Sequence, residues 1–137
     1  MAWTTNVLVV ANRTAGSSEL LDALKKRGEG GETRFTLLVP CDPGGGRTKA
    51  REALDSALEQ LRHAGLEVSG TVGSDADPVG AVMEVWDPAE YDEIVVSTFP
   101  SGASHWLNMD LPQRVAKLTD AHVDHVVAES MRSEAPA

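Results

Sequence analysis

Short apolar segments alternate with amphipathic segments along the chain. Five runs rich in Val, Leu or Ile have the length of strands, and we predict strands over residues 6–11, 33–40, 66–73, 93–97 and 123–128. Between them, apolar residues recur at helical spacing, which predicts helices over residues 18–27, 48–64, 78–87 and 110–118. This alternation predicts a single α/β domain of three layers, with a five-stranded, mostly parallel, Rossmann-like sheet between helices.

Residues at the ends of the predicted helices support these boundaries. Asp77 is a good capping residue and Pro78 suits a first helical turn, while Gly65 is suited to end the helix before it. Asp110 is expected to cap the last helix through its side chain. The helix that begins near Pro78 is expected to bury four large side chains. They are Val79, Val82, Met83 and Trp86.

The fold class indicates where a ligand would bind. In open parallel sheets, ligands lie beyond the carboxyl ends of the strands, where the strand order reverses. We expect the first strand to be central and to lie beside the fourth, which opens a crevice at that edge. The candidate binding residues follow the first, second and fourth strands; they are Ala11, Asn12, Arg13, Val39, Ser97, Thr98, Ser101 and Gly102.

Composition narrows the classes of partner. The 137 residues include 21 acidic and 12 basic ones, so the formal charge is −9. This charge disfavours nucleic acids and anionic membrane surfaces, both of which attract Lys and Arg. Cys41 is the single cysteine, which excludes an internal disulfide and fits the cytoplasm. We find no apolar run of spanning length and no secretion signal, and we expect residues 1–129 to form the domain and residues 130–137 a frayed tail.

A glycine-rich segment carries a second possible interpretation. Gly44–Gly46 follow a predicted strand and precede a helix, so with Arg47 and Lys49 they suggest a phosphate cradle. The spacing is not that of a P-loop, and a flexible connector before a helix is the simpler interpretation.

Two further groups of polar residues suggest catalysis or metal binding. The hydroxyls between Ser97 and Ser104 lie near His105, which allows a small hydrolase as an alternative, although no nucleophile-elbow motif is present. His122 and His125 lie in a predicted strand three residues apart, so they point to opposite faces and we expect no metal site there.

Three segments resemble one known family. The first strand VLVVANRT, the segment DEIVVST and the closing stretch QRVAKLTDAHVDHVV are similar to segments of the universal stress proteins. These are small α/β domains related to the adenine nucleotide alpha hydrolases. The resemblance implies frequent homodimers paired through the last strand, and a crevice that binds ATP or AMP in one branch of the family.

The resemblance is partial at the nucleotide site. Asn12 stands where the ATP-binding branch has Asp, and Val39 matches a position that contacts the base. The family's glycine-rich phosphate signature is missing, since Gly102 is the only glycine in its first part and Asp110 lies near its last part. A carboxylate there repels a triphosphate. We therefore expect a non-catalytic stress-response or regulatory protein whose nucleotide pocket is degenerate. Such a protein acts through a protein partner or an unknown small ligand. The alternative is an adenine-nucleotide-binding protein.

Overall fold

The computed structural model describes residues 4–11, 13–29, 32–41, 46–73, 77–100 and 110–128, with only the backbone of residue 13. Strands and helices follow one another as β1 (Thr5–Val10), the 3₁₀ turn η1 (Arg13–Gly16), α1 (Ser18–Gly28), β2 (Thr33–Val39), α2 (Gly46–His63), β3 (Glu67–Val72), α3 (Pro78–Val85), β4 (Glu93–Thr98), α5 (Leu111–Thr119) and β5 (His122–Val127). The predicted tail, residues 130–137, lies outside the described residues.

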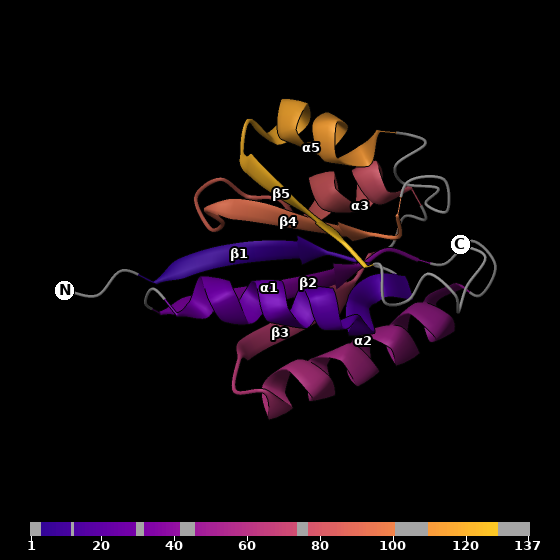
Figure 1. The fold of residues 1–137 in the computed structure, drawn as a ribbon. Helices are drawn as coiled ribbons and strands as arrows, with labels where there is room; N and C mark the ends of the chain where they lie inside the picture. The colour runs from indigo at the N-terminus through magenta and orange to yellow at the C-terminus, as the bar shows by residue number, and fades with distance from the viewer. Residues whose placement is uncertain are drawn as a thin grey trace.

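The five strands form one parallel sheet in the order β3-β2-β1-β4-β5 (Figure 1). β1 is central and pairs with both β2 and β4, with Val10 opposite Leu38 on one side and Val96 on the other. The predicted α/β class, the five strands and the neighbourhood of the first and fourth strands are all confirmed.

Alternate residues of the central strands pack into two separate cores, one on each face of the sheet. On one face, Val7 and Val9 of β1 pack with Leu20 and Leu24 of α1 and with the buried side of α2. On the other face, Leu8 and Val10 pack with residues of α3 and α5, so helices cover both faces of the sheet (Figure 1). Both faces of β1 are fully buried, which explains why its sequence is a continuous apolar run.

The helix ends form largely where the sequence indicates. The Ser17 side chain accepts a hydrogen bond from the Leu20 N–H, and Asp77 accepts one from the Val79 N–H at 3.2 Å. Gly65 has φ +92°, a backbone conformation that favours glycine just after a helix. None of the helices in the described part of the chain is both long and apolar enough to cross a membrane.

The predicted buried face of α3 is partly wrong. Met83 is 43% exposed, whereas Ala81 and Val82 are completely buried. The side of α3 that faces the sheet contains Pro78 and the residues three and four positions after it, Ala81 and Val82. Met83 is the next residue after Val82, so it lies outside this side of the helix. Trp86 ends the helix half-buried and stacks on Tyr91, with the ring centroids 6.0 Å apart.

Candidate functional site

The candidate crevice lies at the carboxyl edge of the sheet, where β1 is flanked by β2 and β4. The chain leaves β1 through Ala11, which is completely buried and donates its N–H to the Leu38 carbonyl at 3.2 Å. The backbone of Arg13 then begins η1, which packs against α2 and β4. Asn12, Ser101 and Gly102 were also predicted for this site and lie outside the described residues.

Ser97 and Thr98 end β4 and point to opposite faces of the sheet. Ser97 is 1% exposed, and its hydroxyl hydrogen-bonds the buried Thr14 hydroxyl of η1 at 2.7 Å. Thr98 is 2% exposed and lies on the face covered by α3 and α5. The two hydroxyls therefore lie on opposite faces of the sheet, because successive side chains of a strand alternate.

The Thr98 hydroxyl forms two hydrogen bonds within the protein. It donates to the Phe99 carbonyl at 2.8 Å and lies 2.7 Å from Nε2 of His125 in β5. A threonine hydroxyl carries one hydrogen, so Nε2 of His125 is the donor in this arrangement. A ring nitrogen that donates to the hydroxyl does not remove its proton, so this pair does not have the geometry of an activated nucleophile. Burial lowers the pKa of His125.

Sequence reasoning did not link His125 to this site. Its partner Thr98 lies 27 residues earlier, and only the pairing of β4 with β5 brings them together. The imidazole considered for a hydrolase, that of His105, lies outside the described residues.

Val39 lies at the end of β2, where the resemblance placed a contact with a base. Its side chain is completely buried in the core beneath α1 and α2. Its carbonyl accepts a hydrogen bond from the Gly73 N–H at 2.9 Å. A ligand at this position would meet backbone rather than the Val39 side chain.

Asp110 precedes α5 but does not cap it as predicted. Its backbone is left-handed, with φ 59°, and its side chain forms no capping hydrogen bond. A side-chain cap normally requires an extended backbone at this position, which is why the carboxylate misses the first N–H groups. Asp110 is exposed, so its charge is open to solvent near the start of α5.

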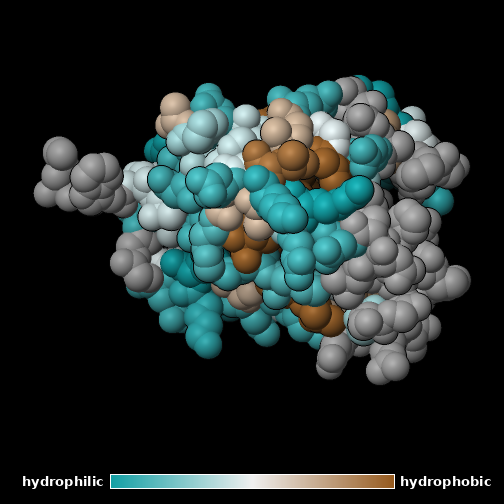
Figure 2. All heavy atoms as spheres, turned by 90° about the horizontal axis from the view of Figure 1, so that it is seen from above, coloured by the Kyte–Doolittle hydropathy of each residue, from teal (hydrophilic) through white to brown (hydrophobic). Residues whose placement is uncertain are grey.

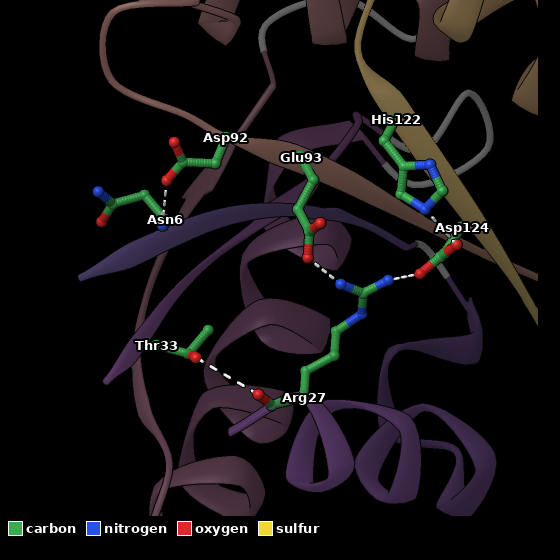
Figure 3. A network of polar contacts seen from close by, with 7 residues as sticks. All are labelled: Asn6, Arg27, Thr33, Asp92, Glu93, His122 and Asp124. Atoms are coloured by element: carbon green, nitrogen blue, oxygen red, sulfur yellow. Dashed lines mark hydrogen bonds and ion pairs between the residues drawn. The ribbon is translucent and has the colours of Figure 1, made fainter. Parts of the chain in front are cut away.

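At the opposite, amino edge of the sheet, charged side chains pair with one another (Figure 3). Arg27, at the end of α1, forms ion pairs with Glu93 of β4 and Asp124 of β5, and burial lowers the pKa of Arg27. Nε2 of His122 lies 2.9 Å from Asp124. Within the described ranges, no group of three or more His, Cys, Asp or Glu side chains is placed to hold a metal ion.

Comparisons with known proteins agree with this architecture. No protein-family model matches the sequence, and no match is found among curated proteins. Among solved structures, a universal stress protein from Archaeoglobus fulgidus matches with a TM-score of 0.64 and 17% identity, over 89% of this chain and 93% of that one. A universal stress protein in complex with cAMP matches with a TM-score of 0.62 and 20% identity, over 94% of this chain and all 100% of that one. This chain therefore has the universal stress protein fold, as its sequence motifs predicted, with a strongly divergent sequence.

Proposed function

We propose that this protein is a non-catalytic regulatory protein that binds an adenine nucleoside or its monophosphate in the crevice between β1 and β4. The observation that carries the proposal is the central position of β1 between β2 and β4, because such a reversal of strand order opens a ligand crevice. Ala11, Asn12, Arg13, Val39, Ser97, Thr98, Ser101 and Gly102 are its proposed lining. The matched structure with cAMP supports this choice, since that protein holds an adenine nucleotide on the same fold.

The charge near α5 favours a ligand with few phosphates. Asp110 is exposed and its carboxylate forms no capping bond, so it is free to repel a phosphate chain at the helix start where such a chain would lie. Each added phosphate increases the repulsion. ATP is therefore the least favoured of the adenine nucleotides. We call the pocket degenerate because it disfavours the triphosphate.

Calorimetry with adenosine, AMP, cAMP and ATP tests the proposal. We expect AMP or cAMP to bind at micromolar concentration and ATP to bind roughly fivefold more weakly, as a nearby exposed carboxylate predicts. The variant Asp110→Asn should narrow that gap, because it removes the charge while asparagine tolerates the left-handed backbone.

Asp120→Asn is the matched control for this experiment. Asp120 is also exposed and left-handed, with φ 56°, but it lies at the other end of α5. It should leave the preference for AMP over ATP unchanged. Absence of heat with adenosine, AMP and cAMP alike would overturn the nucleotide proposal.

A second candidate function is regulation through a protein partner without any nucleotide. Among the described crevice residues, the polar groups already have partners within the protein, since Ser97 bonds Thr14, Thr98 bonds His125, and the Val39 carbonyl accepts from the Gly73 N–H. Calorimetry that shows no nucleotide binding, together with a partner captured by crosslinking at this edge, would favour it.

We also propose that the protein forms a homodimer through β5. β5 is an edge strand with half-buried valines and no neighbour on its outer side among the described residues. Figure 2, a view from above onto the side that carries α5 in Figure 1, shows a compact hydrophobic patch among hydrophilic side chains. Leu118 of α5 is 55% exposed.

Sedimentation velocity tests the dimer. The Ala128 N–H bonds the Thr98 carbonyl, so by alternation the Val127 N–H points away from β4. Val127→Pro should therefore remove one donor needed by a partner strand and leave the bonds to β4 intact. We expect a wild-type dimer and a weakened dimer in this variant; a wild-type monomer at working concentration contradicts the proposal.

The proposed location is the cytoplasm. Cys41 is the single cysteine and is half-buried at the end of β2, so the chain has no internal disulfide to form. Fractionation of cells that produce the protein tests this location, and recovery outside the cytoplasmic fraction contradicts it.

A further inference from the structure

A surface hollow of about 300 Å³ lies beside the first two turns of α2. Its lining residues from α2 are Arg47, Thr48, Arg51 and Glu52, and Val72 contributes from the end of β3. The hollow therefore opens at the carboxyl edge of the sheet, like the crevice. The hollow adjoins the crevice, because Val72 pairs with Val39 of β2, but it lies on the far side of β2 from β1 and β4.

Two guanidinium groups share the helix face that borders this hollow, and neither is paired with a described residue. Arg47 and Arg51 are four residues apart, which places them one above the other on α2. Both side chains are exposed, and neither forms an ion pair or hydrogen bond with any described residue. Arg27 and Arg34, by contrast, pair with carboxylates at the amino edge.

This placement is unfavourable for the isolated helix. Like charges four residues apart repel, and the positive end of the helix dipole opposes cations in the first turns. The first turn of α2 contains no acidic residue that would offset this cost. An anion in the hollow removes both penalties at once, so the arrangement favours a bound negative group over an empty surface.

We propose that the hollow beside α2 binds a phosphoryl group. Two arginine side chains offer forked donors that match phosphate oxygens, and the Thr48 hydroxyl is a further donor with no described partner. The backbone at Gly46 is unobstructed, since an added Cβ there would meet no atom within 4 Å. Glu52 lies on the rim of the same hollow and limits the negative charge that it accepts.

Pyrophosphate and inorganic phosphate are the probes, titrated at low salt and followed by calorimetry and phosphorus NMR. We expect saturable pyrophosphate binding that weakens about tenfold in the double variant Arg47→Gln/Arg51→Gln, because two exposed charge-assisted contacts are lost. Glu52→Gln should tighten binding about twofold by removing a repulsive charge. Added salt should weaken binding to the wild type and have little effect on the double variant.

Lys25→Gln/Lys26→Gln is the matched control. It removes the same charge from two exposed residues in the last turn of α1, at the amino edge. Pyrophosphate binding should be unchanged in this control. Equal binding by the wild type and the double arginine variant, or no saturable binding by the wild type, overturns the proposal.

Two ligands identify the source of the phosphoryl group. If the double arginine variant loses affinity for AMP as well as for pyrophosphate, the phosphoryl group is that of a nucleotide bound in the crevice. If AMP binding is unchanged, the hollow binds a phosphate that is separate from the nucleotide. Adenosine has no phosphate, so its binding tests the crevice alone and keeps failure of the two proposals distinguishable.

Discussion

The two edges of the sheet differ in whether their charged side chains form ion pairs. At the amino edge, Arg27 pairs with Glu93 and Asp124, and Arg34 pairs with Glu67 at 2.9 Å. These contacts tie α1 to β4 and β5, and β2 to β3. At the carboxyl edge, the side chains of Arg47, Arg51 and Asp110 form no hydrogen bonds or ion pairs with described residues.

The difference separates charges that pair between elements of the fold from charges that we propose to interact with ligands. Ion pairs between elements restrict both partners, and removal of one partner of a half-buried pair leaves an uncompensated charge that lowers stability. An unpaired charge on an exposed helix start contributes little to stability but sets the local potential. Substitutions at the amino edge should therefore change unfolding, and those at the carboxyl edge should change binding.

The largest expected effect on stability is at Arg27. Arg27→Met should lower the free energy of unfolding by about 2 kcal/mol, because it leaves the Glu93 and Asp124 carboxylates facing each other without a cation. Arg34→Met removes a pair whose side chains are 63% and 68% exposed, so it should cost below about 0.5 kcal/mol. Urea unfolding measures both; equal losses would contradict the role assigned to Arg27.

A smaller effect is expected from the backbone at Asp110. Asp110→Ser should cost about 1 kcal/mol, since serine is less tolerant of the left-handed region than aspartate or asparagine. Asp110→Asn should be close to neutral. Thermal unfolding of the two variants separates conformational strain from charge, and equal midpoints would show that this conformation carries no penalty.

The pH dependence of stability should reflect His125. Burial lowers its pKa in the folded protein below the unfolded value of about 6.5, so the unfolded chain binds a proton first as the pH falls. The His125 contribution to stability is therefore complete above that value and decreases below it. His125→Gln keeps a donor for Thr98 and should lose less stability than the wild type on acidification. Parallel losses in both proteins would count against this role.

The smallest expected effect on stability is at the hollow. Arg47→Gln/Arg51→Gln should change the free energy of unfolding by less than about 0.5 kcal/mol, and any change should be a gain, because unfavourable charges leave the start of α2. Urea unfolding without phosphate measures this value. A clear loss of stability would show that the arginines support the fold and would weaken the contrast between the two edges.

Much of the fold could be predicted because its signals are local. The apolar run around Val7–Val10 marks a strand buried on both faces, and the Asp77-Pro78 pair marks a helix start that the structure confirms. Met83 shows the limit of this approach. Helical spacing indicates which residues share a face, but the packing of α3 against the sheet decides where the buried sector ends.

The candidate site was less predictable because its contacts join distant parts of the chain. Thr14 and Ser97 hydrogen-bond across 83 residues, and the pairing of Thr98 with His125 depends on the register of β4 against β5. Which residues end the strands was legible from the sequence; which hydroxyls were already satisfied was not.

The sequence by itself determined the order of strands and helices and the parallel sheet, and it indicated the edge at which we propose a ligand crevice, since period, capping and chain direction are local properties. Only the tertiary structure decided which charges are paired. Arg27 pairs with two carboxylates, whereas Arg51 pairs with none of the described residues. This difference depends on which elements pack side by side, and the spacing of residues along one helix does not contain that information.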